Sequence, residues 1–253
     1  MDLGLKGKKA IVTGGTRGIG RAIADLLVAE GCDVAVCART PAQVESAVAA
    51  FKARGVNAAG EAFDVADGDA LEAFVNRMAE TLGGLDIFVS NISGAMGGGN
   101  DPASWRQAVD VDILSTVRGC EAAVPHLEKS GAGAIVVIGT VSSVEISGPR
   151  RPYNAVKGAL PPYVKGLARD LAAKNVRANL VSPGSIYFEG GVWNMIQNAM
   201  PAMYEATLAR NPMGRMGRPD EVADAAVYLA SPRASFVTGS NLICDGGITQ
   251  RVG

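Results

Sequence analysis

The chain has 253 residues, of which 48% are hydrophobic, enough for one large α/β domain with a sizeable core. A formal net charge of −1 without a basic stripe argues against an electrostatic nucleic-acid binder. No apolar stretch approaches the roughly 20 residues of a membrane span, and no signal-peptide pattern is present. We therefore expect a cytoplasmic protein with neither nucleic-acid nor membrane partners.

Short β-branched runs alternate with longer amphipathic stretches along the chain. The runs are 10–12, 34–36, 87–89, 135–138 and 178–181, and the helical stretches are 18–29, 41–53, 69–82, 104–127 and 153–173. Near-continuous apolar strands alternating with helices are typical of a parallel sheet that is covered on both faces. The sequence therefore predicts a Rossmann-type α/β fold, a doubly wound parallel sheet in one domain over residues 1–253.

A glycine-rich turn follows the first predicted strand and leads directly into a helix. Glycines in such a turn allow a tight bend, close approach of a pyrophosphate and close packing of helix on strand. The helix N-terminus offers free N–H groups and a positive dipole to phosphates. The candidate cofactor-binding residues here are Gly14, Thr16, Arg17, Gly18, Ile19 and Gly20.

The end of the second predicted strand indicates the preferred dinucleotide. NAD-binding domains usually place an acidic residue there, whereas this strand is followed by Arg39. Arg39 can bind a 2′-phosphate through two N–H groups, with Arg17 beside it. We expect NADP(H) as cofactor, with NAD(H) as the alternative.

The four cysteines and the single histidine show no spacing typical of a metal site, so we expect no bound metal and reduced thiols in the core. The cysteines are Cys32, Cys37, Cys120 and Cys244.

Tyr153 and Lys157 lie four residues apart at the start of a predicted helix, which places both side chains on one face. A free phenol has a pKa of about 10, too high for proton transfer at neutral pH. A nearby ammonium stabilises the phenolate and lowers that pKa. Tyr153 can then exchange a proton with a carbonyl or alcohol oxygen while Lys157 tunes the phenol.

Two further features of the second half of the chain carry expectations. Pro161 and Pro162 fall inside the helical stretch that begins at Tyr153, so we expect a kink directly behind this pair. Residues 185–215 are apolar and irregular, which is typical of a substrate loop or lid; a surface helix pair packed on the sheet is the alternative.

Taken together, these motifs resemble the short-chain dehydrogenase/reductase family, with a length close to that of beta-ketoacyl carrier-protein reductases. The motifs that carry the resemblance are 13–20, Asp64-Val65, Asn91–Gly94, Tyr153-Lys157, Pro183-Gly184, 215–222, 237–239 and 245–247.

The resemblance implies a strand order of 3-2-1-4-5-6-7 and a homo-oligomer, either a tetramer or a dimer. It implies that Asp64 and Val65 contact the adenine and that Asn91 and Gly94 line the cofactor cleft. It further implies that Pro183, Gly184 and Ile186 pass beside the nicotinamide, and that Lys157 also holds the nicotinamide ribose.

Three positions depart from the family pattern. Thr140 occupies the place of a serine that bonds the substrate oxygen, with Ser142 and Ser143 nearby as alternatives. Asp112 occupies the place of an asparagine beside the lysine, where its charge would offset the pull of the ammonium on Tyr153. Phe188 stands where the family commonly has a threonine that bonds the nicotinamide carboxamide.

We interpret the sequence as an NADP(H)-dependent oxidoreductase that interconverts a ketone and a secondary alcohol by hydride transfer. The expected catalytic residues are Tyr153, Lys157, Thr140 and Asp112, and the expected substrate is hydrophobic or cyclic. The main alternative, favoured by the three departures, is a dinucleotide-binding sensor or partner subunit with weak catalysis; a redox-neutral isomerase or dehydratase is a further one.

Overall fold

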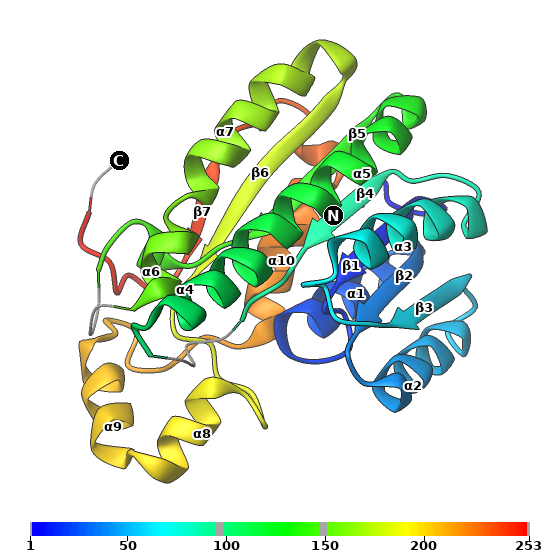
Figure 1. Cartoon of the computed structure of the whole chain (residues 1–253). Helices are drawn as coiled ribbons and strands as arrows, with labels where there is room; N and C mark the ends of the chain where they lie inside the picture. Colours follow the sequence, from blue (N-terminus) through cyan, green and yellow to red (C-terminus); the bar gives the residue numbers. More distant parts are fainter. Residues whose placement is uncertain (1, 95–98, 147–150, 252–253) are drawn as a thin grey trace.

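A computed structural model describes residues 2–94, 99–146 and 151–251. Its centre is a seven-stranded sheet in the order β3-β2-β1-β4-β5-β6-β7 (Figure 1), and every neighbouring pair of strands is parallel. The strands are β1 (Lys9–Thr13), β2 (Asp33–Ala38), β3 (Ala58–Ala62), β4 (Ile87–Ser90), β5 (Gly133–Ile138), β6 (Val176–Pro183) and β7 (Asn241–Cys244). The strand order that the family resemblance implied is therefore confirmed.

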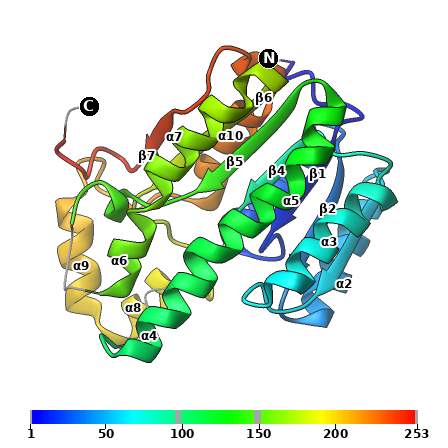
Figure 2. The same ribbon diagram turned by 45° about the horizontal axis from the view of Figure 1, so that its top comes forward.

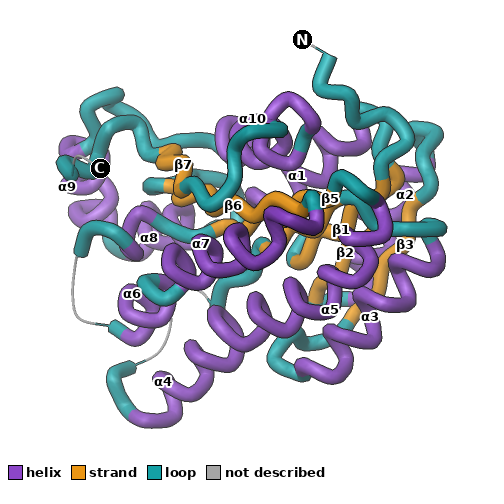
Figure 3. The backbone as a smooth tube through the Cα atoms, turned by 90° about the horizontal axis from the view of Figure 1, so that it is seen from above, coloured by secondary structure: helices purple, strands orange, loops and turns teal. Residues whose placement is uncertain are grey.

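Helices cover both faces of the sheet (Figure 3). Side chains of β1 alternate between two separate cores, because Ala10 and Val12 pack on one face and Ile11 packs on the other. The first core is closed by α1 (Gly18–Ala29), α2 (Pro41–Lys52) and α10 (Pro219–Ala230). The second is closed by α3 (Gly68–Thr81), α5 (Ser115–Ser130) and α7 (Leu160–Leu171).

The remaining helices gather beyond the carboxyl ends of the strands (Figure 2). They are α4 (Pro102–Ala108), α6 (Pro152–Lys157), α8 (Val192–Ala199) and α9 (Pro201–Arg210). In open parallel sheets, ligands bind at the carboxyl ends of the strands. The fold therefore places the predicted site residues at the end of the sheet where a ligand is expected.

The helix expected over 104–127 is not one uniform α-helix. α4 passes through a π-helical turn at Val109–Leu114 before α5 begins. A π-turn inserts an extra residue into the helix and is frequent at functional sites. Here it contains Asp112, whose side chain is buried.

Where the kink behind Tyr153 was expected, the helical stretch is divided into α6 and α7 at Gly158 and Ala159, two residues that keep right-handed helical φ and ψ values. Pro161 and Pro162 lie in the first turn of α7, where backbone N–H groups have no intrahelical partner to lose. The catalytic candidates thus stand on a separate helix of six residues.

All four cysteines are free thiols as expected, and three of them are buried. In the described part of the chain, no helix is long and apolar enough to cross a membrane. Within the same ranges, no group of three or more histidine, cysteine or carboxylate side chains could hold a metal ion.

Candidate active site

The glycine turn joins β1 to α1 and presents the N-terminus of a twelve-residue helix. Gly14 and Gly18 have φ values of +64° and +54°, a region that other residues rarely adopt. No side chain caps the helix, and its first turn contains no acidic residue. The first N–H groups of α1 thus have no capping side chain, and together with the helix dipole they form the kind of helix start that binds anions.

Asn91, which directly follows β4, holds the glycine turn in place. Its backbone N–H donates to Thr13 Oγ1 at 3.0 Å, and its Nδ2 donates to the carbonyls of Thr13 and Gly14 at 3.2 and 3.3 Å. A Cβ on Gly14 would lie 2.7 Å from the Asn91 carbonyl oxygen, so this position requires glycine. Gly20 is required for the same reason, because its Cβ would collide with Asn91 Nδ2 and the Gly14 carbonyl.

The residues expected to contact the adenosine half of a dinucleotide lie at the carboxyl ends of β2 and β3. Arg39 follows β2 and is exposed, and within the described ranges its guanidinium has no hydrogen bond or ion pair. Asp64 and Val65 follow β3, and Asp64 accepts a hydrogen bond from the N–H of Ala66 at 3.0 Å. Thr16 lies 3.5 Å from Gln43 Oε1 on α2.

Tyr153 lies on α6, with its phenol between two hydroxyl side chains. Thr140, after β5, and Ser93, after β4, both hydrogen-bond the phenol and favour its ionised form. Burial outweighs them and raises the pKa of Tyr153, and the charge of Asp112 raises it further. The expectation that the Lys157 ammonium lowers this pKa was therefore wrong: the ammonium is paired with Asp112 at 3.1 Å, and the net shift is upward. In this arrangement the phenol keeps its proton and can donate it.

Lys157 lies one turn further along α6, and its side chain is 1% exposed. Its Nζ donates to the Ile92 carbonyl at 2.7 Å and lies 3.1 Å from Asp112 Oδ1. Burial lowers the pKa of Lys157, and the ion pair with Asp112 opposes that shift. The carboxylate of Asp112 also accepts the N–H of Gly94 at 3.2 Å, so it ties the residues after β4 to the lysine.

Of Thr140, Ser142 and Ser143, it is Thr140 that hydrogen-bonds the Tyr153 phenol in the described part of the chain. Thr140 Oγ1 also accepts the N–H of Ser142 at 3.2 Å. Ser143 Oγ donates to the Thr140 carbonyl at 2.6 Å. Both neighbouring serines thus support the turn that presents Thr140.

Pro183 and Gly184 end β6 beside the site. The N–H of Gly184 donates to the Cys244 carbonyl at 2.9 Å, and a Cβ on Gly184 would lie 2.8 Å from Asp245. Ile186 is buried and forms a parallel bridge with Gly217. The bridge holds the start of the 185–215 segment against Gly217, which lies just after the end of that segment.

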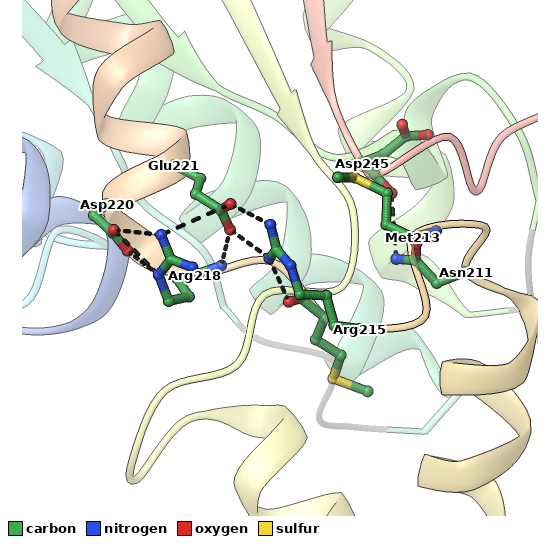
Figure 4. A network of polar contacts seen from close by, with 8 residues as sticks. Asn211, Met213, Arg215, Arg218, Asp220, Glu221 and Asp245 are labelled. Atoms are coloured by element: carbon green, nitrogen blue, oxygen red, sulfur yellow. Dashed lines mark hydrogen bonds and ion pairs between the residues drawn. The ribbon is translucent and has the colours of Figure 1, made fainter.

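The 185–215 segment contains α8 and α9, which extend beyond the sheet instead of packing on its face (Figures 1 and 2). A polar network holds its far end to α10 (Figure 4). Arg215 forms a two-point ion pair with Glu221 at 2.6 and 2.9 Å, and Glu221 Oε2 accepts the N–H of Arg218 at 2.8 Å. These bonds lower the pKa of Glu221 to about 2.

Two partners of the catalytic candidates were missed in the sequence. Ser93 bonds the Tyr153 phenol, and the carbonyl of Ile92 accepts from Lys157. Ser93 lies within the predicted 91–94 motif, so its place after β4 was the available signal. A backbone carbonyl gives no signal of its own in a sequence.

A family model described as enoyl-(acyl carrier protein) reductase matches residues 14–249. The chain belongs to the short-chain dehydrogenase/reductase family, a family of oxidoreductases. Its similarity to isoepoxydon dehydrogenase patN of Penicillium expansum is 37% identity, over 98% of this chain and 97% of that protein.

Solved short-chain dehydrogenase/reductase structures superpose over nearly the whole chain. A Burkholderia cenocepacia short-chain dehydrogenase in complex with NADP is 33% identical, with a TM-score of 0.87 over 96% of this chain and 98% of that one. L-Sorbose reductase of Gluconobacter frateurii, complexed with NADPH and L-sorbose, is 29% identical, with a TM-score of 0.90 over 100% of both chains.

Proposed function

We propose that this protein is an NADP(H)-dependent oxidoreductase that reduces a ketone to a secondary alcohol and catalyses the reverse oxidation. The observation that carries the proposal is the Tyr153 phenol, flanked by the Thr140 and Ser93 hydroxyls with Lys157 one helical turn away. A protonated phenol near the carboxyl ends of the strands, where a dinucleotide would bind, suits proton transfer coupled to hydride transfer.

The residues present fit a dinucleotide. The uncapped N-terminus of α1, with Gly14 and Gly18 at positive φ, suits a diphosphate. Arg39 is exposed and unpaired within the described ranges, so it is available to a 2′-phosphate, which favours NADP(H) over NAD(H). Two structural neighbours are complexes with NADP or NADPH.

Around the dinucleotide, Asp64 and Val65 would border the adenine. Asn91 and Gly94 would line the cleft that holds the cofactor. Pro183, Gly184 and Ile186 would lie beside the nicotinamide.

When bound, the reduced nicotinamide supplies the hydride that reaches the carbonyl carbon. Thr140 donates a hydrogen bond to the carbonyl oxygen and polarises it. Tyr153 gives its phenolic proton to the same oxygen, so the alcohol forms as the phenolate appears. The Lys157 ammonium stabilises that phenolate, and Asp112 holds the lysine in place.

We assign the substrate subsite to the 185–215 segment, which leaves large apolar side chains exposed at this end of the molecule. Met195, Met200 and Met203 are 44–58% exposed, and Tyr187 packs edge-on against Tyr204 with ring centroids 6.2 Å apart. Flexible methionines and aromatic rings suit a hydrophobic or cyclic carbonyl compound.

We further propose that the whole chain is one domain that assembles into a homo-oligomer, a tetramer or a dimer. Leu242 on the edge strand β7 and Tyr228 on α10 are partly exposed. Apolar side chains around an open sheet edge support such an interface.

The proposal is tested by replacing Tyr153 with Phe, which removes only the proton donor. We expect Y153F to fold and to bind NADPH while its turnover falls by at least about 100-fold, the lower end of general acid catalysis. The assay follows NADPH consumption on a panel of ketones. Turnover retained at the wild-type level would reject the mechanism.

A second candidate is a dinucleotide-binding protein with little catalysis. It is favoured by the Asp112–Lys157 ion pair, which offsets the ammonium that would acidify the phenol. Wild-type protein that binds NADPH but reduces no member of the panel would support this alternative.

A further inference from the structure

Phe188 lies directly on the glycine turn. A Cβ built on Gly18 would lie 2.6 Å from the Cζ atom of the Phe188 ring, and one built on Gly191 would lie 2.9 Å from the same ring. The ring is therefore enclosed between two glycines and touches the first residue of α1. Only the absence of side chains at both positions allows this contact.

A second contact holds the same segment to the glycine turn. Arg17 Nη1 points to the carbonyl of Gly190 at 3.4 Å, a long and exposed hydrogen bond. Within the segment, Tyr187 donates to Gln197 at 2.8 Å, and Asn194 donates to the Tyr187 hydroxyl at 2.9 Å. Residues 187–197 are thus tied to one another more strongly than to the turn beneath them.

The position of the ring conflicts with a diphosphate at the same turn. Phosphate oxygens that accept N–H groups at the start of α1 must approach the backbone of Gly18 closely. A phenyl ring in contact with Gly18 covers that approach, and it offers no hydrogen bond in return. The ring and the diphosphate therefore compete for one surface.

We propose that Phe188 is a gate over the glycine turn, and that the dinucleotide binds only after the ring has left Gly18. The inference rests on the proposed function, since it takes the glycine turn as the dinucleotide site. Binding then occurs in two steps: residues 187–197 open first, and the dinucleotide associates with the open form. The measured affinity is reduced by the fraction of protein that is open.

The chain contains two tryptophans, and one of them reports on the gate. Trp193 lies on α8, five residues after Phe188, whereas Trp105 lies on α4. In a W105F background, Trp193 fluorescence is followed by stopped flow after mixing with increasing NADPH. We expect the observed rate to level off at the opening rate.

In the same background, F188A removes the ring, so the plateau should disappear. We expect NADPH to bind F188A roughly tenfold more tightly than the parent protein. This figure assumes that burial of the ring makes the closed form about ten times as abundant as the open form. F188L, which keeps part of the apolar contact, should give an intermediate affinity. F236A is the matched control, because it makes the same substitution at a fully exposed position and should leave both quantities unchanged.

Three results separate failure of the gate from failure of the proposed function. Weaker NADPH binding by folded F188A would mean that the ring clamps the bound dinucleotide, and would overturn the gate. Unchanged rates and affinities in F188A and F188L would also overturn it. If neither the wild type nor F188A binds any dinucleotide by calorimetry, the proposed function fails, and the gate fails with it.

Discussion

Asp112 sets the charge around the proton donor. Thr140 and Ser93 hydrogen-bond the Tyr153 phenol, and Asp112 and the Ile92 carbonyl bind Lys157. Because the Asp112 charge raises the pKa of Tyr153, D112N should lower that pKa. Alcohol oxidation requires the phenolate, so the acid limb of its pH–rate profile should move to lower pH in D112N.

The control for this prediction is D110N, which removes an equal charge from an exposed residue of the same π-helical turn. Its pH profile should match the wild type. An acid limb that moves to higher pH in D112N, or moves equally in both variants, would show that the Asp112 charge does not act on Tyr153.

At the residue scale, we expect Arg39 to produce the preference for NADP(H). Hydrogen bonds to charged groups contribute about 1.5–3 kcal/mol, so R39A should weaken NADPH binding roughly 10- to 100-fold. NADH has no 2′-phosphate, so its Kd should stay the same. Calorimetric titration of both cofactors measures the difference, with R54A as a matched loss of an exposed arginine. Equal losses for NADPH and NADH would refute the assignment.

The sequence reveals site residues only where local spacing reflects local structure. Tyr153 and Lys157 lie one helical turn apart, so their proximity follows from the sequence alone. The pairing of Lys157 with Asp112 depends instead on the packing of α6 against the π-helical turn, and only the family register suggested it. Ser93 comes from a third part of the chain, and no periodic pattern connects it to Tyr153.

At the scale of elements, strands were predicted where apolar β-branched residues dominate. The residue pattern identified five of the seven strands. β3 has the sequence Ala-Ala-Gly-Glu-Ala and is only partly buried, and β7 has four residues at the sheet edge. Such strands are defined by pairing with a neighbour more than by their own composition, so they were recognised only through the family resemblance.

At the scale of elements, the ion pair between Arg215 and Glu221 is expected to restrain the end of the 185–215 segment. R215A removes the two-point ion pair with Glu221, whereas R218A removes the exposed pair with Asp220 and only a longer contact with Glu221, at 3.8 Å. We expect limited proteolysis to cut within residues 187–214 faster in R215A, with R218A close to the wild type. Equal cleavage in R215A and the wild type would show that the ion pair does not restrain the segment.

The same ion pair has a defined pH window. The pKa of Glu221 falls from 4.5 to about 2 in the folded protein, so its contribution is complete above pH 4.5 and is lost as the pH falls toward 2. Both side chains are about one-third or more exposed, and solvent screening keeps this contribution small. The faster cleavage of R215A should therefore be full at neutral pH and diminish as the pH falls through about 2, measured with an acid-active protease.

For the whole molecule, dinucleotide binding should be linked to global stability, because the proposed site includes residues at the carboxyl ends of β1 to β6. A ligand at 100 times its Kd stabilises the native state by about 2.7 kcal/mol. For a chain of this size that corresponds to a rise in Tm of about 5–10 °C. Differential scanning fluorimetry should show this rise with NADPH and a smaller one with NADH at equal concentration; equal rises would contradict the preference.

Because α8 and α9 project beyond the sheet, the proposed substrate-binding residues belong to different elements from the proposed proton-transfer residues. The residues proposed to transfer the proton lie at the strand ends and on α6, while the helix pair contributes little to either hydrophobic core. Transplanting a homologous helix pair from another member of the family should retarget the enzyme to a different carbonyl compound and leave its folding intact. Laboratory evolution of this scaffold is best concentrated on those two helices.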